Sequence, residues 1–282
     1  MSQSTFEPES FQRLARETAA ALRLGDGYEP GPLAHFGRAL AQADRFIDIG
    51  ANRGLYACLA NRVLRNSEIA MVEANPQLAE NLRLAIAQWP TENGNKITVY
   101  PVAAGDVSTK LPFFIDELDT LSSFVLNPEQ TDKSGYMDLH HRRNIRRMDV
   151  ACEPLDKLFS PAPRTLIKMD VEGFEYRALV GAKRLLSAKD TRLQVELHGW
   201  GDAERGKYPL HVMWYMNTRG FAISRIGRSY SYDFTPTTSL GRCISLAKSG
   251  PTFTLKHILD RSGLRPLMYR VMRPVLPAHA ER

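Results

Sequence analysis

The stretch FIDIGANRG, residues 46–54, decides the fold. It is an apolar run that carries an acid near its end, followed by a glycine-bracketed turn, and residues 55–64 then have the composition of a helix. A strand, a tight turn and a helix in this order open the sheet of a nucleotide-binding α/β protein. The sequence therefore predicts an α/β fold with a mostly parallel sheet.

The glycines of this turn do not fit a dinucleotide. Gly50 and Gly54 are four residues apart, so the G-x-G-x-x-G spacing is missing, and Asp48 places a carboxylate where two phosphates would sit. A cationic ligand is expected instead. S-adenosylmethionine meets this requirement, with Asp48 receiving its ammonium and Gly50, Asn52 and Gly54 lining its site. An ordinary tight turn is the alternative, because short glycine motifs match by chance.

A second acid follows the next predicted strand, residues 68–72. Glu73 lies at the distance from the glycine turn at which such folds place a carboxylate that binds ribose hydroxyls. Its position at a strand end favours a ligand contact. The alternative is a residue that stabilises the dipole of a helix starting at Asn75 and Pro76.

A third candidate follows the predicted strand at residues 97–102. The small residues Ala103, Ala104 and Gly105 would let a flat ring approach, and Asp106 would accept a hydrogen bond from an exocyclic amine, as adenine recognition requires. A solvent-facing turn acid is the alternative for Asp106.

Charge and composition exclude several classes of protein. The net charge of +6 is modest, and much of the excess gathers in four arginines of residues 142–147 and in the C-terminal tail. This is too local for a nucleic-acid surface, so no nucleic-acid partner is expected. Three scattered cysteines without C-x-x-C spacing favour a reducing compartment. With no signal peptide and no membrane-spanning run, we expect a cytoplasmic protein.

The chain divides into three parts around one large domain. Residues 1–43 form a lead-in with an amphipathic helix at 11–24, and residues 44–250 form the main domain. Within it, the polar, turn-rich insertion 107–153 follows the third strand and is assigned to acceptor recognition, with a solvated loop as the alternative. Residues 251–282 form a basic amphipathic tail.

The end of the main domain is predicted to be antiparallel. Residues 205–218 read as a helix, 220–226 as a strand and 241–246 as its hairpin partner. Tyr230, Tyr232 and Phe234 are then placed in the connecting loop. Their rings would stack on a sugar or pack on one another.

The sharpest motif is D-V-E-G-F-E, residues 170–175, which follows a buried strand and precedes a helix. The strand LQVELH, residues 193–198, comes next. Together with FIDIGANRG, MVEANP, PVAAGD and CEPLDKLF, this order of motifs resembles the FkbM family of S-adenosylmethionine-dependent methyltransferases over about residues 44–226.

The resemblance implies O-methyl transfer to a hydroxyl of a sugar, glycan or related small-molecule acceptor. It also implies a Rossmann-like class I methyltransferase fold, with a seven-stranded, mostly parallel sheet and an antiparallel terminal hairpin. In this reading Asp48 and Gly50 lie at the methionine end of the cofactor, Glu73 at the ribose and Asp106 at the adenine. The acceptor is not named by the fold.

The acceptor side needs a group that activates a hydroxyl, which is a poor nucleophile at neutral pH. Asp170, Glu172, Glu196 and His198 are expected to converge at the ends of neighbouring strands, and we assign catalysis to Asp170, Glu172 and His198. His198 is the one that titrates near neutrality without help. Alternatively, Glu172 caps a helix beginning near Phe174 and His198 is structural. The three carboxylates would suit Mg²⁺, although their spacing does not establish a metal.

Two other functional classes are weighed against the enzyme. A nicotinamide-dependent oxidoreductase needs phosphate-loop glycines that are missing here. A binding or scaffold protein without catalysis would be expected to lack Asp48 or Glu73, and both are present. The tail is predicted to contact an anionic membrane surface as an interfacial helix, or else to pack on the protein's own sheet or on a second subunit.

Overall fold

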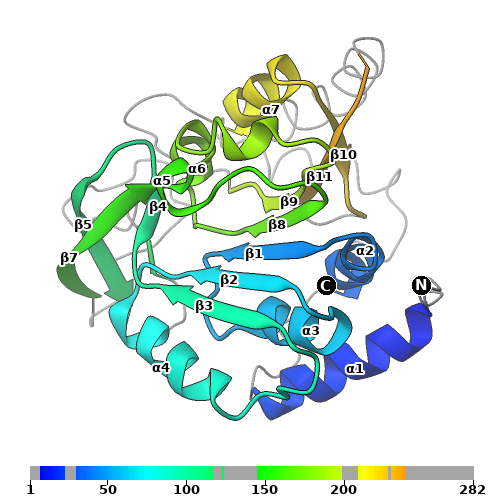
Figure 1. The fold of residues 1–282 in the computed structure, drawn as a ribbon. Helices are drawn as coiled ribbons and strands as arrows, with labels where there is room; N and C mark the ends of the chain where they lie inside the picture. Colours follow the sequence, from blue (N-terminus) through cyan, green and yellow to red (C-terminus); the bar gives the residue numbers. More distant parts are fainter. Residues whose placement is uncertain are drawn as a thin grey trace, which may run out of the picture.

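The computed structural model describes residues 7–22, 30–116, 122–123, 145–198, 209–227 and 230–238. Its main sheet contains seven strands, which are β1 (Arg45–Ile49), β2 (Glu68–Val72), β3 (Lys96–Tyr100), β8 (Thr165–Met169), β9 (Arg192–Glu196), β10 (Phe221–Arg225) and β11 (Ser231–Pro236). They lie in the order β10-β11-β9-β8-β1-β2-β3 (Figure 1).

The main sheet is parallel except at one end. β1 pairs in parallel with β2 and β8, β2 pairs with β3, and β8 pairs with β9. β11 runs antiparallel to both of its neighbours, β9 and β10. The predicted α/β fold with seven strands and an antiparallel terminal hairpin is confirmed.

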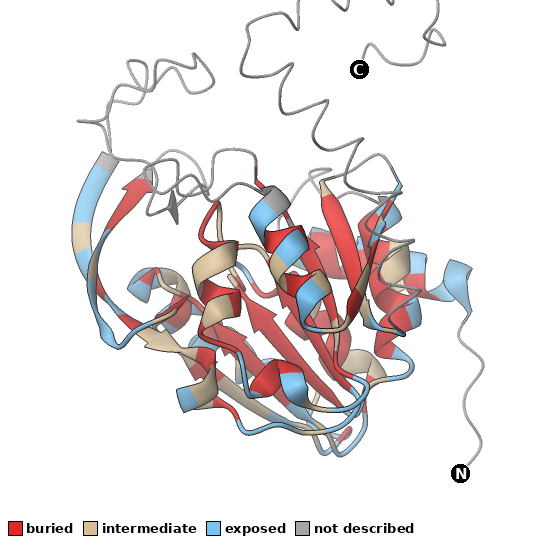
Figure 2. Cartoon of the chain, turned by 90° about the horizontal axis from the view of Figure 1, so that it is seen from above, coloured by how far each residue is buried: buried red, intermediate tan, exposed pale blue. Residues whose placement is uncertain are grey.

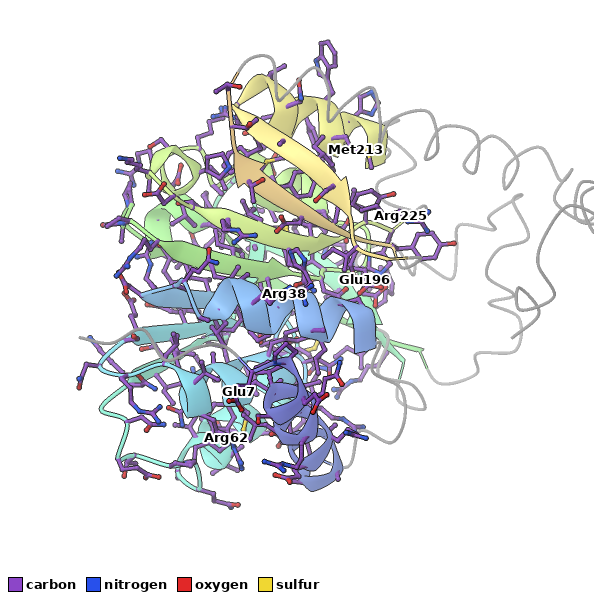
Figure 3. All side chains as sticks on the ribbon, turned by 90° about the vertical axis from the view of Figure 1, so that its right-hand side faces the viewer. Glu7, Arg38, Arg62, Glu196, Met213 and Arg225 are labelled. Atoms are coloured by element: carbon purple, nitrogen blue, oxygen red, sulfur yellow. The ribbon has the colours of Figure 1, made fainter. Side chains whose placement is uncertain are left out.

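Helices cover both faces of this sheet. One face is covered by α1 (Pro8–Ala21), α2 (Pro30–Leu40), α3 (Leu55–Val63) and α4 (Pro76–Ile86), and the other by α5 (Leu155–Leu158), α6 (Glu175–Val180) and α7 (Pro209–Thr218). Successive side chains of a strand point to opposite faces, so Phe46 packs in the first core and Ile47 in the second. The strands are accordingly buried between the helix layers (Figure 2), and Met213 of α7 is fully buried (Figure 3).

The N-terminal part contains one helix more than predicted. Helix α1 matches the expected helix at 11–24, whereas α2 lies where a glycine- and proline-rich lead-in was expected. Proline is compatible with the first turn of a helix, so Pro30 and Pro32 do not prevent it. Aromatic rings in tilted and edge-to-face contact hold both helices against β1, with ring centroids 6.3 Å apart for Phe11 and Phe36 and 5.2 Å apart for Phe36 and Phe46.

The predicted insertion forms most of a second sheet. Its strands are β4 (Ala103–Gly105), β5 (Thr109–Asp116), β6 (Ser122–Ser123) and β7 (Ile145–Pro154), in the order β4-β7-β5-β6. This sheet stands beyond the carboxyl ends of β1, β2 and β3 (Figure 1). Its buried side chains include Phe113, Val150 and Cys152, which pack with Phe174 from the main domain. The strand predicted at 124–126 lies outside the described residues.

The hairpin at the end of the main sheet uses a different partner from the predicted one. β10 pairs with β11, which contains Tyr232 and Phe234, two of the three aromatic residues we placed in a loop. Tyr232 and Phe234 are buried in the core, so they do not form an exposed platform for a sugar ring. Alternating aromatic residues suit a half-buried strand, and that pattern overrides the loop assignment. Residues 241–246 lie outside the described ranges.

Within the parts of the chain that the structure describes, no helix has the length and apolar character needed to cross a membrane. The basic tail, residues 251–282, lies outside these parts. Its predicted contact with a membrane or a second subunit stays a prediction.

Candidate active site

A cavity opens at the carboxyl ends of β1, β2 and β8. About 630 Å³ of space lies between its walls, including the open mouth. Apolar side chains from both sheets form most of its wall. The described residues that line it are Ile49, Gly50, Asn52, Val72, Glu73, Ala74, Leu78, Val102, Ala103, Ala104, Phe113, Asp170, Val171, Glu172 and Phe174. These include three acids and no lysine or arginine, so the cavity suits a cationic ligand.

The glycine turn brings two strand ends into contact. Gly50 has a φ of +77°, and a Cβ atom there would lie 1.8 Å from the carbonyl oxygen of Asp170. Gly54 has a φ of +80° and begins α3, with the Leu82 side chain 2.7 Å from where its Cβ would be. Gly50 was expected to make room for the cofactor. It lines the cavity, but the backbone of β8 is what requires a glycine here.

Glu73 lies in the cavity wall at the end of β2. Its two carboxylate oxygens accept hydrogen bonds from the backbone N–H groups of Asn52 and Asn75, both at 2.8 Å. Burial raises the pKa of Glu73, and these backbone donors oppose the rise. Asn52 also lines the cavity, and its side-chain oxygen Oδ1 is buried without a hydrogen-bond partner in the structure. Both residues thus present fixed polar atoms to a ligand.

Asp48 lies beneath the cavity and not in its wall. It accepts a backbone hydrogen bond from Ala57 in the first turn of α3, and its side chain is buried. Burial raises its pKa to about 7, although the positive charge of Lys168 opposes this. Its expected contact with the methionine end of the cofactor stays a prediction. The alternation of side chains along β1 sends Asp48 to the face covered by α3.

Asp106, which we expect at the adenine, also lies outside the cavity wall, and its contact with the cofactor stays a prediction. Its Oδ1 forms an ion pair with Arg177 of α6 at 3.2 Å, and Asp106 does not line the cavity. Ala74, Phe113 and Phe174 provide apolar wall on that side instead. Flat apolar surface of this kind is what a purine ring packs against.

The D-V-E-G-F-E segment forms a tight turn between β8 and α6. Glu172 has a φ of +51° and Gly173 a φ of +94°, both in the left-handed region. A non-glycine residue in this region is uncommon and often marks a functional turn. The turn is closed by Glu175, whose Oε1 accepts a hydrogen bond from the Gly173 N–H at 3.0 Å. Helix α6 has Phe174 as its N-cap, so the reading of Glu172 as the helix cap is not supported.

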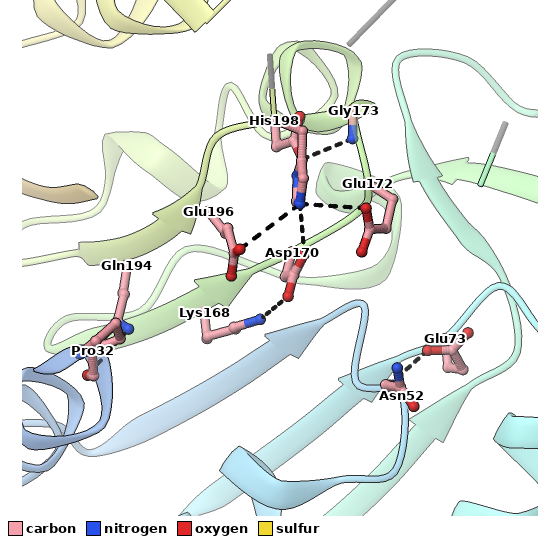
Figure 4. A network of polar contacts seen from close by, with 11 residues as sticks. Pro32, Asn52, Glu73, Lys168, Asp170, Glu172, Gly173, Gln194, Glu196 and His198 are labelled. Carbon is pink, nitrogen blue, oxygen red and sulfur yellow. Dashed lines mark hydrogen bonds and ion pairs between the residues drawn. The ribbon is translucent and has the colours of Figure 1, made fainter. Parts of the chain in front are cut away.

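Four carboxylates surround the imidazole of His198, and we call these five residues the His198 cluster (Figure 4). Nδ1 lies 2.9 Å from Glu175. Nε2 lies 3.3 Å from Glu172, 3.8 Å from Asp170 and 3.9 Å from Glu196. Asp170, Glu172, Glu196 and His198 therefore converge as expected.

The His198 cluster changes the protonation of its members. Burial opposes the charge on His198, but the hydrogen bond and charge of Glu175 and the charges of Asp170 and Glu172 raise its pKa to about 10. The expectation that His198 titrates near neutrality is therefore wrong, because the sequence did not show how many acids surround it. Burial raises the pKa of Glu172 to about 7, although His198 opposes this.

A buried lysine forms an ion pair with one member of the His198 cluster. Lys168 Nζ lies 2.8 Å from Asp170 Oδ2 and 5.0 Å from the centre of the Tyr56 ring. Burial opposes ionisation of Asp170, but the charges of Lys168 and His198 outweigh it and lower the pKa of Asp170. Asp170 is therefore ionised and held in position.

Two residues of this site were missed in the sequence. Glu175 was visible as the last acid of D-V-E-G-F-E, but nothing in the spacing indicated that it would contact His198, 23 residues later. Lys168 sits inside an apolar strand, and a lysine inside a buried strand is a usable signal because buried charges are normally paired.

A known protein family matches this sequence. The family model for the methyltransferase FkbM domain matches residues 48–223. Methyltransferase FkbM from Methylobacillus flagellatus KT is similar in structure, with 17% identity and a TM-score of 0.45, covering 80% of this chain and 58% of that one. The chain therefore spans less than two thirds of that protein. No curated protein matches the sequence.

Two further solved structures are similar. The O-methyltransferase TomG from Streptomyces achromogenes, in complex with S-adenosylmethionine, has 14% identity and a TM-score of 0.40, covering 83% of this chain and 92% of that one. An S-adenosylmethionine-dependent methyltransferase from Aquifex aeolicus has 12% identity and a TM-score of 0.39, covering 82% of this chain and 98% of that one.

The fold and the family model agree. The sheet order, with antiparallel β11 between β9 and β10, is the Rossmann-like class I methyltransferase fold. The matched residues 48–223 contain the glycine turn, the cavity wall and the His198 cluster. They make up more than half of the 282 residues. The chain therefore belongs to the FkbM family of methyltransferases.

Proposed function

We propose that this protein is an S-adenosylmethionine-dependent O-methyltransferase acting on a hydroxyl of a sugar, glycan or related small-molecule acceptor. The observation that carries the proposal is the cavity at the carboxyl ends of β1, β2 and β8, whose charged lining residues are all acids. An acidic cavity favours a cationic methyl donor over the pyrophosphate of a nicotinamide cofactor. Membership of the FkbM family supports methyl transfer.

The methyl donor fits the residues at one end of the cavity. Glu73 is held by two backbone donors and keeps lone pairs for two ribose hydroxyls. Asn52 Oδ1, buried and without a partner in the structure, offers a further acceptor beside it. Phe113 and Phe174 offer apolar surface to the adenine. The donor's sulfonium would then point toward Asp170 and Glu172.

The acceptor side of the proposal uses the other end of the cavity. The acceptor oxygen attacks the methyl carbon, and the carbon–sulfur bond breaks with its electron pair passing to sulfur. The leaving thioether is neutral and needs no acid, so the protein has to orient the hydroxyl and take up its proton. Asp170 and Glu172 line the cavity at this end, and a carboxylate of the His198 cluster is the proposed proton acceptor. The charges of the surrounding carboxylates raise the pKa of His198, which favours a carboxylate over the imidazole for this role.

Calorimetry and a labelled-methyl screen test this function. Purified full-length protein should bind S-adenosylmethionine and S-adenosylhomocysteine but not NAD. It should transfer label from the methyl donor to some member of a panel of nucleotide sugars, glycans and hydroxylated natural products. NAD binding without a response to the methyl donor would contradict the proposal. Cofactor binding without transfer to any acceptor would favour the non-catalytic binding protein.

A further inference from the structure

We infer that the chain binds one divalent cation through Asp170, Glu172 and His198, at the ends of β8 and β9. This deepens the proposed function and rests on it for the role of the ion, but the binding itself is tested separately. From the sequence, Asp170, Glu172 and Glu196 would suit Mg²⁺ if the site uses an ion, but their spacing does not establish one. The structure replaces Glu196 with His198 and so changes the chemistry of the donor set.

The three ligand atoms are spaced for a common ion. One atom each from Asp170, Glu172 and His198 lie within 4.8 Å of one another. With bonds of about 2.0–2.2 Å, two ligands of one cation lie about 3.0 Å apart at right angles and about 4.2 Å apart when opposite. The distances from His198 Nε2 to Glu172 Oε2, 3.3 Å, and to Asp170 Oδ1, 3.8 Å, fall in this interval.

Two atoms of the site are buried and aimed at this point. Asp170 Oδ1 is buried without a hydrogen-bond partner in the structure, while its other oxygen contacts Lys168. The His198 side chain is only 7% exposed, and its Nε2 faces the same space (Figure 4). A buried oxygen without a hydrogen-bond partner is costly, and a cation bound to Asp170 Oδ1 would remove that cost.

The orientation of His198 is the one found in metal sites. Its Nδ1 contacts Glu175, so Nε2 is the nitrogen that faces Asp170 and Glu172. Histidines that bind metals nearly always donate their other N–H to a carboxylate or carbonyl, which fixes the tautomer and the ring orientation. Glu175 is thus a positioning residue for the proposed ion.

The charge of the site also calls for a cation. Four carboxylates lie within 4 Å of the His198 ring nitrogens, against two neighbouring cations, Lys168 and the protonated His198. A divalent ion bound at Nε2 would displace the proton of that nitrogen to solvent. The surplus of negative charge is concentrated at the cavity wall, since Asp170 and Glu172 both line the cavity. A divalent ion would neutralise it and lower the pKa of an acceptor hydroxyl, so that the hydroxyl would pass its proton more readily to the carboxylate proposed above as the proton acceptor.

The donor set indicates which ion to use as a probe. Carboxylates suit Mg²⁺ and Mn²⁺, and imidazole suits first-row transition metals. Mn²⁺ accepts both kinds of ligand and has a spectroscopic signal. Mn²⁺ is therefore the probe. Mg²⁺ is the comparison, because a site that includes an imidazole should prefer Mn²⁺, whereas a site made of oxygen ligands alone should also accept Mg²⁺.

The test is a titration of chelator-treated, dialysed full-length protein with Mn²⁺, followed by electron paramagnetic resonance and calorimetry. We expect one ion per chain. The affinity for Mn²⁺ should fall more than about tenfold in each of the three ligand variants, Asp170→Asn, Glu172→Gln and His198→Gln. It should fall about tenfold in Glu175→Gln, because the His198 ring is then no longer held in orientation. Glu196→Gln is the matched control, because it removes a neighbouring charge outside the three ligands, and it should change affinity less than about threefold.

S-adenosylhomocysteine affinity and thermal unfolding verify that each variant is folded. Among these variants, Glu172→Gln should disturb the fold least, because the Glu172 side chain is partly exposed to solvent. Asp170→Asn also removes the ion pair with the buried Lys168. No saturable Mn²⁺ binding by the wild type at millimolar concentration would overturn the inference. An equal loss of Mn²⁺ affinity in Glu196→Gln and Glu172→Gln would also overturn it. That result would mean that Mn²⁺ is attracted by the total negative charge and is not bound by specific ligands.

The two proposals fail in different ways. If labelled methyl transfer persists unchanged in a chelator and Mn²⁺ does not bind, the cation site is rejected and the methyltransferase stands. If Mn²⁺ binds to the three ligands but neither the methyl donor nor its product binds, the proposed function is rejected and the cation site stands.

Discussion

Glu175 Oε1 makes two contacts: it lies 2.9 Å from His198 Nδ1 and accepts a hydrogen bond from the Gly173 N–H at 3.0 Å. One buried oxygen atom therefore links the D-V-E-G-F-E turn to the end of β9. This contact determines that Nε2, and not Nδ1, faces Asp170 and Glu172.

Glu175→Gln should lower the pKa of His198. Glutamine keeps an oxygen that accepts hydrogen bonds but removes the charge, which is a main cause of the raised pKa. We expect the midpoint to fall by about one unit or more from the wild-type value near 10. Nuclear magnetic resonance of the imidazole in chelator measures it, with Glu80→Gln on exposed α4 as the control. An unchanged midpoint would show that Glu175 does not act on His198.

Asp48→Asn should stabilise the cofactor-free protein more at high pH than at low pH. Burial raises the pKa of Asp48 from 3.8 to about 7, so between these values the folded state holds a proton that the unfolded state releases. The wild type therefore loses stability as the pH rises through this window, and asparagine does not. The difference in unfolding free energy should grow by on the order of 3 kcal/mol between pH 4 and pH 8. Urea denaturation at both pH values measures it, and a constant difference would refute the shifted pKa.

Gly50→Ala should destabilise the fold more than Gly220→Ala. Both glycines have positive φ angles, +77° and +98°, but a Cβ at Gly50 would lie 1.8 Å from the Asp170 carbonyl oxygen, and one at Gly220 meets nothing within 4 Å. Both variants therefore strain the backbone, but only Gly50→Ala adds a steric clash, so their difference measures the clash. Gly50→Ala should cost about 1–3 kcal/mol more and should weaken S-adenosylhomocysteine binding, since β1 and β8 must move apart. Equal losses in thermal denaturation would mean that the two strand ends are not in tight contact.

Glu73→Gln should weaken cofactor binding and leave the protein folded. Glutamine keeps one oxygen for a backbone donor but loses the charge-assisted hydrogen bonds to the ribose, at a cost of about 1–3 kcal/mol of binding free energy. Calorimetry with S-adenosylhomocysteine measures this cost. Glu68→Gln at the exposed start of the same strand is the control and should bind as the wild type does. Full affinity in Glu73→Gln would place the ribose elsewhere.

The tail, residues 251–282, lies outside the described residues, and its contact is still to be tested. If it is an interfacial helix, full-length protein should sediment with anionic but not with neutral vesicles, and less at high salt, because each cation contributes about 1 kcal/mol and is screened. A chain ending at Gly250 is the control. Equal sedimentation of both chains would favour packing of the tail on the protein itself or on a second subunit.

The sequence by itself determined the order of strands and helices around the cavity. FIDIGANRG, residues 46–54, and D-V-E-G-F-E, residues 170–175, are local signals, because a strand, a turn and a helix are encoded by residues close together in the chain. The position of acids at successive strand ends also followed from sequence, since the carboxyl ends of parallel strands meet at one edge. The convergence of Asp170 and His198 was therefore predictable.

The tertiary structure alone decided what each of these residues contacts. Asp48 carries the expected acid, yet the alternation along β1 buries it under α3. Asp106 pairs with Arg177, 71 residues away. His198 was expected to titrate near neutrality, but Glu175 and its neighbours hold it in the charged form. Protonation and contact depend on side chains that distant segments bring within a few ångströms, and no local pattern in the sequence encodes those distances.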